Sequence, residues 1–284
     1  MISGTRYKLT LEINRQLSLA RAIERSQIEI STKKRIQTAS DDPVAAARVS
    51  DIAIAQANEA TWKSNLDLAA ALSARADTTI KAAVTAMDRV NELVLIAKTG
   101  TTSAEGRATI ALELRSIAEE LTALKDTKDS RGGRLFMSGI SLEIPVAAGM
   151  TMTAVATREE VFESVPTAGG PQDLAAIVTA AANAVELPDA TRAAAVEAAL
   201  VDVGSAMTHI QSKRAEQGAR GNRFDQLLDR QADTALQLTE ERSGLEDTNI
   251  IEATAKLQAR QLTLDAAQAV FARVNQNTLF DLLR

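Results

Sequence analysis

The chain has 284 residues, no cysteine, a single histidine and a net charge of −5. These counts exclude a disulfide scaffold, a thiol nucleophile, a cysteine zinc site and two-histidine metal motifs, and the acidic balance argues against a general nucleic-acid binder. Hydrophobic residues make up 45% of the chain but aromatic residues only 2%, which is typical of long, alanine-rich helices packed side by side rather than of a thick globular core.

The first 42 residues predict one helix and the start of another. Apolar residues recur in steps of three, four and seven, which predicts a single helical stripe. Its members are Leu9, Ile13, Leu17, Ala20, Ile23 and Ile30. Charged residues interrupt the apolar positions of this segment, so it does not read as a cleavable signal peptide. Asp42 is expected to cap the next helix, with Pro43 as its first residue.

The second helix is expected to be very long, from Pro43 to Lys98, or roughly 80 Å at about 1.5 Å per residue. Its apolar seam steps almost strictly by three and four, so it needs partners of similar length. The seam consists of Trp62, Leu66, Ala69, Leu72, Ala76, Ile80, Ala83, Met87, Val90, Val94 and Ala97. Gly100 is expected to end it, and Ser103 to cap a shorter antiparallel helix.

The helical period disappears between about residues 134 and 172. Residues 142–146 and 150–154 alternate like short strands, and Gly149, Pro166 and the Gly-Gly-Pro at 169–171 punctuate them. This stretch is too short for a large sheet, so it predicts a small β-rich insertion.

Helices then resume to the end of the chain. A short amphipathic helix is expected to end before Pro188, and a long one to begin near Asp189. A polar stretch at residues 214–221 predicts partial exposure or a bend in that helix. The last helix follows Gly244, and no apolar run of 18 residues predicts a membrane span anywhere.

The predicted fold is mainly α: an elongated rod of long antiparallel coiled-coil-like helices with a small β-rich insertion domain in the middle of the chain. The expected domains are a terminal assembly helix at each end, two halves of a helical rod, and the insertion with its short helix. Their boundaries are 1–40, 41–133, 134–188, 189–246 and 247–284.

No arrangement of residues predicts catalysis, a cofactor or a metal. His209 lacks converging acid or nucleophile partners and is expected to be a packing or surface residue. Adjacent acidic residues do not face each other on a helix, so they predict solvated faces. Gly132-Gly133 lacks the Lys-Ser/Thr ending of a phosphate loop. We therefore expect no enzymatic activity, no nucleic acid and no membrane among the ligands.

The terminal stripes are the candidate partner-binding residues. At the C-terminal end, apolar residues at strict seven-residue spacing are followed by a cluster that nothing downstream can cover, which indicates a partner surface. The twelve candidates are Leu9, Ile13, Leu17, Ile23, Ile250, Leu257, Leu264, Phe271, Leu279, Phe280, Leu282 and Leu283. Because each stripe lacks its neighbour in a monomer, both termini are expected to be largely disordered before assembly.

Several segments resemble flagellin-like axial proteins of the bacterial flagellum. They are residues 30–36, residues 40–46 with Ser40-Asp41-Asp42-Pro43, residues 89–94, Asn222-Arg223-Phe224-Asp225, and residues 246–253. They follow the family's order and cover most of the two helical arms. Asp41-Asp42-Pro43, the glycine- and phenylalanine-containing stretch at 133–139 and the Leu-Phe-Asp ending are more similar to the family members at the hook–filament junction than to filament flagellin.

The resemblance implies a structural adaptor that stacks helically with copies of itself and joins a hook-side hook-associated protein to filament flagellin. It also implies secretion to the flagellum without a cleavable signal peptide, with an export chaperone on the C-terminal helix. Two alternatives stay open. A filament flagellin would polymerise alone into long filaments, whereas a cytoplasmic coiled-coil binding module would not be secreted and would have no need of the β-rich insertion.

Overall fold

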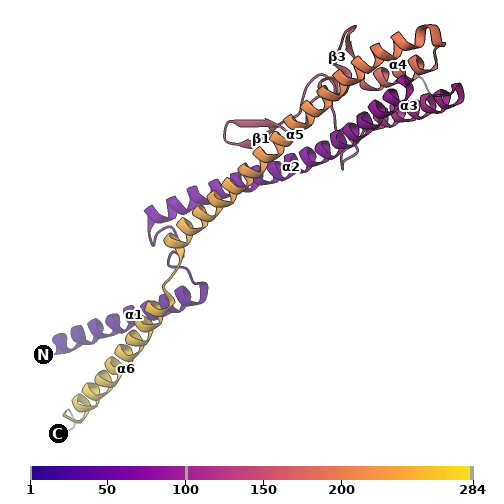
Figure 1. Cartoon of the computed structure of the whole chain (residues 1–284). Helices are drawn as coiled ribbons and strands as arrows, with labels where there is room; N and C mark the ends of the chain where they lie inside the picture. Colours follow the sequence, from indigo (N-terminus) through magenta and orange to yellow (C-terminus); the bar gives the residue numbers. More distant parts are fainter. Residues whose placement is uncertain (1, 100–101, 282–284) are drawn as a thin grey trace. The chain divides into compact units, whose positions relative to one another are not determined.

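The computed structural model describes residues 2–99 and 102–281, and the chain divides into two compact units (Figure 1). Unit 1 comprises residues 1–57 and 234–284, and unit 2 comprises residues 58–233. Both divisions fall inside the two longest helices, whereas the expected domain boundaries lay in connecting segments. The predicted fold class is confirmed: the described chain is mainly α, with two small antiparallel two-stranded sheets.

Unit 1 is organised around the two terminal helices, α1 (Ile2–Thr32) and α6 (Ile250–Asp281), which lie side by side (Figure 1). The guanidinium of Arg260 on α6 donates to the carbonyl oxygen of Ala22 at 3.1 Å and to the Ser26 hydroxyl at 2.5 Å. Near the other end of this pairing, the backbone N–H of Thr248 donates to the carbonyl oxygen of Lys33 at 2.9 Å. The pair is antiparallel, because Ala22 and Ser26 contact Arg260 whereas the later Lys33 contacts the earlier Thr248.

Unit 2 is built on two long helices that run antiparallel, α2 (Pro43–Lys98) and α5 (Asp189–Glu246). Three side-chain contacts join them: Glu59 with Gln231, Ser73 with Gln217, and Lys98 with Glu197. Residue numbers rise along α2 as they fall along α5, so the two helices are antiparallel. The predicted α2 seam is confirmed, because all its members are buried except Trp62 and Leu72, which are half-buried.

Helix starts follow the predicted capping chemistry. The Oδ1 atom of Asp42 accepts a hydrogen bond from the Ala45 N–H at 3.0 Å, just where α2 begins. The Ser103 hydroxyl accepts from the Gly106 N–H at 3.1 Å at the start of α3 (Ala104–Lys125). These side chains satisfy backbone donors that have no partner within the helix. The predicted helix end at Gly100 lies outside the described residues.

The predicted insertion contains two hairpins and a short helical turn. Strands β1 (Glu143–Ala147) and β2 (Met150–Thr153) pair antiparallel, as do β3 (Val165–Thr167) and β4 (Gly170–Gln172), with the π-helix η1 (Glu159–Glu163) between them. Phe136 and Phe162 meet edge to face with ring centroids 5.1 Å apart. Both rings belong to the same buried cluster as the helices, so the insertion shares their core.

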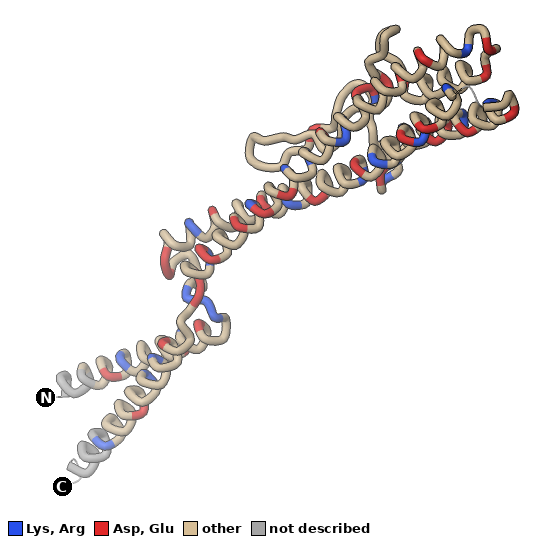
Figure 2. The backbone as a smooth tube through the Cα atoms, in the orientation of Figure 1, with Lys and Arg blue, Asp and Glu red and all other residues tan. Residues whose placement is uncertain are grey.

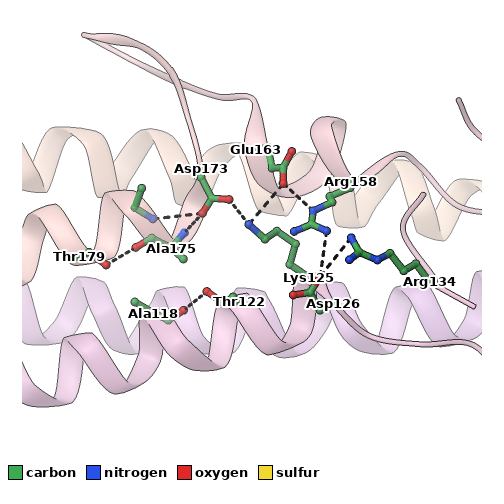
Figure 3. A network of polar contacts seen from close by, with 11 residues as sticks. Ala118, Thr122, Lys125, Asp126, Arg134, Arg158, Glu163, Asp173, Ala175 and Thr179 are labelled. Carbon is green, nitrogen blue, oxygen red and sulfur yellow. Dashed lines mark hydrogen bonds and ion pairs between the residues drawn. The ribbon is translucent and has the colours of Figure 1, made fainter. Parts of the chain in front are cut away.

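Helix α4 (Leu174–Glu186) completes unit 2 by packing on α3. A network of charged side chains joins the two helices to the insertion (Figure 3). Lys125 at the end of α3 contacts Asp173, the N-cap of α4, at 2.5 Å, and Glu163 at 3.6 Å. Arg158 bridges Glu163 and Asp126 at 2.7 and 3.0 Å. Although its burial acts in the opposite direction, these two carboxylates raise the pKa of Arg158.

The partial exposure expected of α5 at residues 214–221 is confirmed, and the helix is continuous there: Ala215, Glu216 and Ala219 are exposed, and only Gln217 is buried. Gln217 is buried, and its side-chain amide donates to the Ser73 hydroxyl at 2.8 Å and to the Ala154 carbonyl oxygen at 2.9 Å. Gln217 is therefore polar for an internal reason: its side chain satisfies groups from α2 and from the insertion at the same time.

Candidate functional site: an assembly surface on the terminal helices

Helix α1 has two apolar faces instead of the single predicted stripe. Ile23 and Ile30 are half-buried on the side that packs on α6, together with the buried Ser26. Leu9, Ile13 and Leu17 lie on another side and are 39, 43 and 50% exposed. A helix turns about 100° per residue, so each step of three falls about 60° short of a full turn. Two such steps between Leu17 and Ile23 move the stripe from one face to the next.

Helix α6 contacts α1 through the residues at seven-residue spacing. Leu257, Leu264 and Phe271 are half-buried, on the same side as the buried Ala253. Ile250, the first member of the predicted stripe, is 42% exposed at the helix start. The heptad pattern therefore identifies the intramolecular face of α6, which packs on α1 within one chain.

A second apolar stripe on α6 was missed by the sequence interpretation. Its residues follow steps of four and three on the side opposite Ala253, and all are exposed. They are Ile251, Ala255, Ala259, Leu262, Ala266 and Val270. Ile251, Leu262 and Val270 are 84, 72 and 62% exposed. Alanines between the larger residues hid this stripe, since alanine is common on both solvated and buried helix faces.

The predicted C-terminal cluster cannot be placed on this surface. Leu282 and Leu283 lie outside the described residues. Leu279 and Phe280 belong to α6, but their side chains lie outside the described part of the chain. The outward surface that the structure does describe consists of the α1 stripe of Leu9, Ile13 and Leu17 together with the second stripe of α6. We call these two stripes the outward faces.

Ionic and backbone contacts hold the base of the terminal helix pair. Residues Lys34 and Asp247 form an antiparallel bridge, and the Arg35 N–H donates to the carbonyl oxygen of Glu246 at 2.7 Å. The Lys34 ammonium lies 2.9 Å from the Glu246 carboxylate, and this bond lowers the pKa of Glu246. The segment between α1 and α2 is thereby fixed to the segment between α5 and α6.

The other sequence candidates have structural explanations. The Nε2 atom of His209 lies 3.0 Å from the carbonyl oxygen of Glu160, and burial lowers the pKa of this histidine, so it packs α5 against η1. The carboxylate of Asp129 accepts the N–H groups of Arg131 and Gly133, which makes that glycine pair part of a turn. In residues 2–99 and 102–281, no three metal-binding side chains converge, and no helix is long and apolar enough to cross a membrane.

A helical subunit with apolar side chains on the outward sides of its terminal helices has the features of an assembling structural protein. Two family models match the chain in order: the bacterial flagellin N-terminal helical region over residues 9–140, and the bacterial flagellin C-terminal helical region over residues 200–283. The chain belongs to this flagellin-like family of structural proteins of the bacterial flagellum.

Individual relatives of the chain are also flagellar proteins. Flagellar hook-associated protein 3 of Escherichia coli K12 is 24% identical over 89% of this chain and 90% of its own length. The Salmonella typhimurium protein of the same name is 22% identical, over 90% of this chain and 91% of its own length. B-type flagellin of Pseudomonas aeruginosa is 31% identical, but over only 33% of this chain and 19% of its own length.

Solved structures support the fold. A putative flagellar hook-associated protein from Vibrio parahaemolyticus aligns with a TM-score of 0.66 at 19% identity, covering 73% of this chain and all of that structure. The flagellar junction protein FlgL of Legionella pneumophila aligns with a TM-score of 0.59 at 14% identity, covering 70% of this chain and all of that structure. Like its relatives, this chain is a structural component of the bacterial flagellum.

Proposed function

We propose that this chain is the adaptor at the hook–filament junction, where copies of it form a helical ring between a hook-side hook-associated protein and filament flagellin. The end-to-end similarity to two proteins named flagellar hook-associated protein 3 supports this role. This role is structural, and it involves no catalytic step. It reaches the flagellum by secretion without a cleavable signal peptide, and an export chaperone binds its C-terminal helix beforehand.

The observation that carries the proposal is the pair of outward faces in unit 1. Burying large apolar side chains stabilises by about 1.5–3 kcal/mol each, so leaving Ile251, Leu262 and Val270 in water is costly unless a neighbour covers them. Leu9, Ile13 and Leu17 present the same problem on α1. Each terminal helix therefore has one face for the other terminal helix and one for an adjacent subunit.

Filament flagellin is the second candidate, supported by the local similarity to B-type flagellin. Both roles use the same outward faces, so the site does not separate them. Location does: fluorescent labelling of an introduced surface cysteine in intact cells should give a single band at the hook–filament boundary. Labelling along the whole filament would reject the junction role in favour of flagellin.

Substitutions on the outward faces test the assembly role. Leu262→Asp and Ile13→Asp should abolish attachment of the filament while the purified variants keep the helical signal of the parent. Leu112→Asp on α3 is the matched control, because Leu112 is also exposed and apolar but lies in unit 2. Normal filaments in both outward-face variants would refute the proposal. Deleting residues 270–284 should likewise prevent assembly while unit 2 remains folded.

A further inference from the structure

A cleft of about 550 Å³ at the base of the terminal helix pair has five cations among its lining residues. Arg21 and Arg25 line it from α1, and Lys256 and Arg260 from α6. Arg35 adds a fifth positive charge, whereas Glu29 and Glu252 are its two carboxylates. The cleft therefore carries an excess of positive charge in a chain whose net charge is −5. We call it the basic cleft; its helices are α1 and α6 of Figure 1, and Figure 2 shows their Lys and Arg positions in blue in the same orientation.

Three of the five cations already make hydrogen bonds or ion pairs within the chain. Arg260 donates to α1, Lys256 lies 2.7 Å from Glu252, and Arg35 donates to the Leu245 carbonyl oxygen at 3.0 Å. Within the part of the chain that the structure describes, Arg21 and Arg25 form no ion pair. Hydrogen bonds from the backbone N–H groups of Thr38 and Gln37 are the main causes of the lowered pKa of Asp41, and the charge of Arg25 acts in the same direction.

The start of α6 adds unused hydrogen-bonding capacity to the same cleft. Thr248 is one of its lining residues, and the buried hydroxyl of Thr248 has no hydrogen-bond partner among the described residues. Thr248 precedes the first turn of α6, whose backbone N–H groups carry partial positive charge. Cations, an unpaired hydroxyl and a helix start in one cleft together favour carboxylate acceptors as its ligand.

The spacing of the cations favours a helix as the occupant. Arg21 and Arg25 are one helical turn apart on α1, and Lys256 and Arg260 are one turn apart on α6, which is about 6 Å in each case. Carboxylates repeated every four residues on a helix have the same spacing. The sequence contains a single run of three such carboxylates, Asp225, Asp229 and Asp233. All three are exposed on α5.

We propose that the basic cleft of one subunit binds the acidic face of α5, Asp225, Asp229 and Asp233, on a second copy of the chain. This inference rests on the proposed self-assembly and names an ionic contact that would set the register between neighbouring copies. The outward faces supply apolar area that fixes the position of a neighbouring subunit only loosely. Paired charges one helical turn apart, by contrast, are separated when one subunit shifts by a single residue along the other. Small anions and acidic proteins other than this chain are the competing occupants.

The test is a charge exchange between two variants of the full chain, followed by sedimentation velocity over about 50 to about 500 mM salt. Arg21→Glu with Arg25→Glu, and separately Asp229→Lys with Asp233→Lys, should each weaken self-association roughly tenfold or more at low salt. An equimolar mixture of the two variants should recover association, because reversed charges then face each other. Arg21→Lys with Arg25→Lys should retain most of it.

Matched controls use exposed charges of unit 2 that belong neither to the basic cleft nor to the acidic face of α5. Arg75→Glu with Lys81→Glu, and Glu119→Lys with Glu120→Lys, should leave association unchanged. Helical circular dichroism and the melting temperature of each variant identify any that fail to fold; neutral Arg21→Gln with Arg25→Gln then replaces the reversal.

The outcomes separate this inference from the proposed function. Loss of association in both reversed variants with recovery in the mixture supports the contact. Loss in the arginine variant alone overturns it, since the occupant is then a different anion. No loss in either variant also overturns it while leaving wild-type assembly intact. Absence of wild-type association, together with normal filaments in the outward-face variants, would instead reject the proposed self-assembly.

Discussion

Replacing Gln217 by leucine should destabilise unit 2 although the new side chain is apolar and of similar size. The glutamine is 1% exposed, and its amide donates to the Ser73 hydroxyl at 2.8 Å and to the Ala154 carbonyl oxygen at 2.9 Å. Leucine fills the volume but donates nothing. Ser73 can turn its own hydroxyl towards another acceptor, so the main loss is the Ala154 carbonyl, a buried acceptor left without a partner. That loss costs about 2 kcal/mol. Gln217→Ala adds a cavity and should cost roughly 3–4 kcal/mol.

Urea unfolding followed by far-ultraviolet circular dichroism measures these differences. Gln226→Leu on the exposed side of the same helix is the control and should stay within about 0.5 kcal/mol of the parent. Ser73→Ala should cost about 1 kcal/mol, and its cycle with Gln217→Leu should show coupling of about 1 kcal/mol. The reasoning is refuted if Gln217→Leu is neutral or stabilising and the cycle shows additivity.

Three further predictions concern the ionic contacts and the terminal helices. Asp173→Ala removes both the N-cap of α4 and the partner of the poorly exposed Lys125, and should cost about 2 kcal/mol in urea unfolding; Asp173→Asn keeps the cap and should cost about half as much. Because Lys34 lowers the pKa of Glu246 in the folded chain, this contact stabilises above the ordinary carboxyl pKa of about 4.5 and is lost as the pH falls below it. Glu246→Gln should therefore reduce the loss of stability between about pH 5 and pH 3, and an unchanged profile would contradict this. In a verified monomer, amide protons of α1 and α6 should exchange much faster than those of residues 58–98, and equally slow exchange would contradict the expectation of weakly held termini.

The hydrogen-exchange prediction follows from how little the terminal pair buries. Among the described residues of α1 and α6, only Ser26 and Ala253 are buried. Over residues 58–98, by contrast, α2 buries most of its predicted seam, including Leu66, Ile80 and Met87. Ordering a residue costs about 1–2 kcal/mol of backbone entropy, which tertiary contacts must offset. A two-helix pair with so small a core has little to offset this cost within one chain.

Helix boundaries could be predicted from the sequence because they depend on local chemistry. Asp42 and Pro43 define the start of α2, Ser103 caps α3, and Pro188 separates α4 from α5. Each of these signals acts within a few residues and does not depend on distant contacts. The two strands predicted around the turn at Gly149 are found for the same reason, since that glycine adopts a φ of +70° that other residues rarely adopt.

Contacts between distant residues could not be predicted in this way. From the sequence alone, Gln217 is expected to be an exposed polar residue. In the folded chain it is buried against Ser73 and Ala154. The basic cleft has the same character, because Arg21 and Arg260 are remote in sequence and meet only through the antiparallel pairing of α1 with α6. Periodicity identifies a face, but it does not identify which other element covers it.

The second stripe of α6 shows why the faces of an assembling helix are hard to read. Apolar residues on one side give a strong helical period, but Leu257 and Leu264 on one side and Ile251 and Leu262 on the other largely cancel it. A helix that is apolar on two sides cannot bury both against a single antiparallel partner. Helix α1 covers one side, and the other side stays exposed within the chain. The weak amphipathic contrast of the C-terminal helix is thus a consequence of its two apolar sides, and the proposed partner of the exposed side is another flagellar subunit.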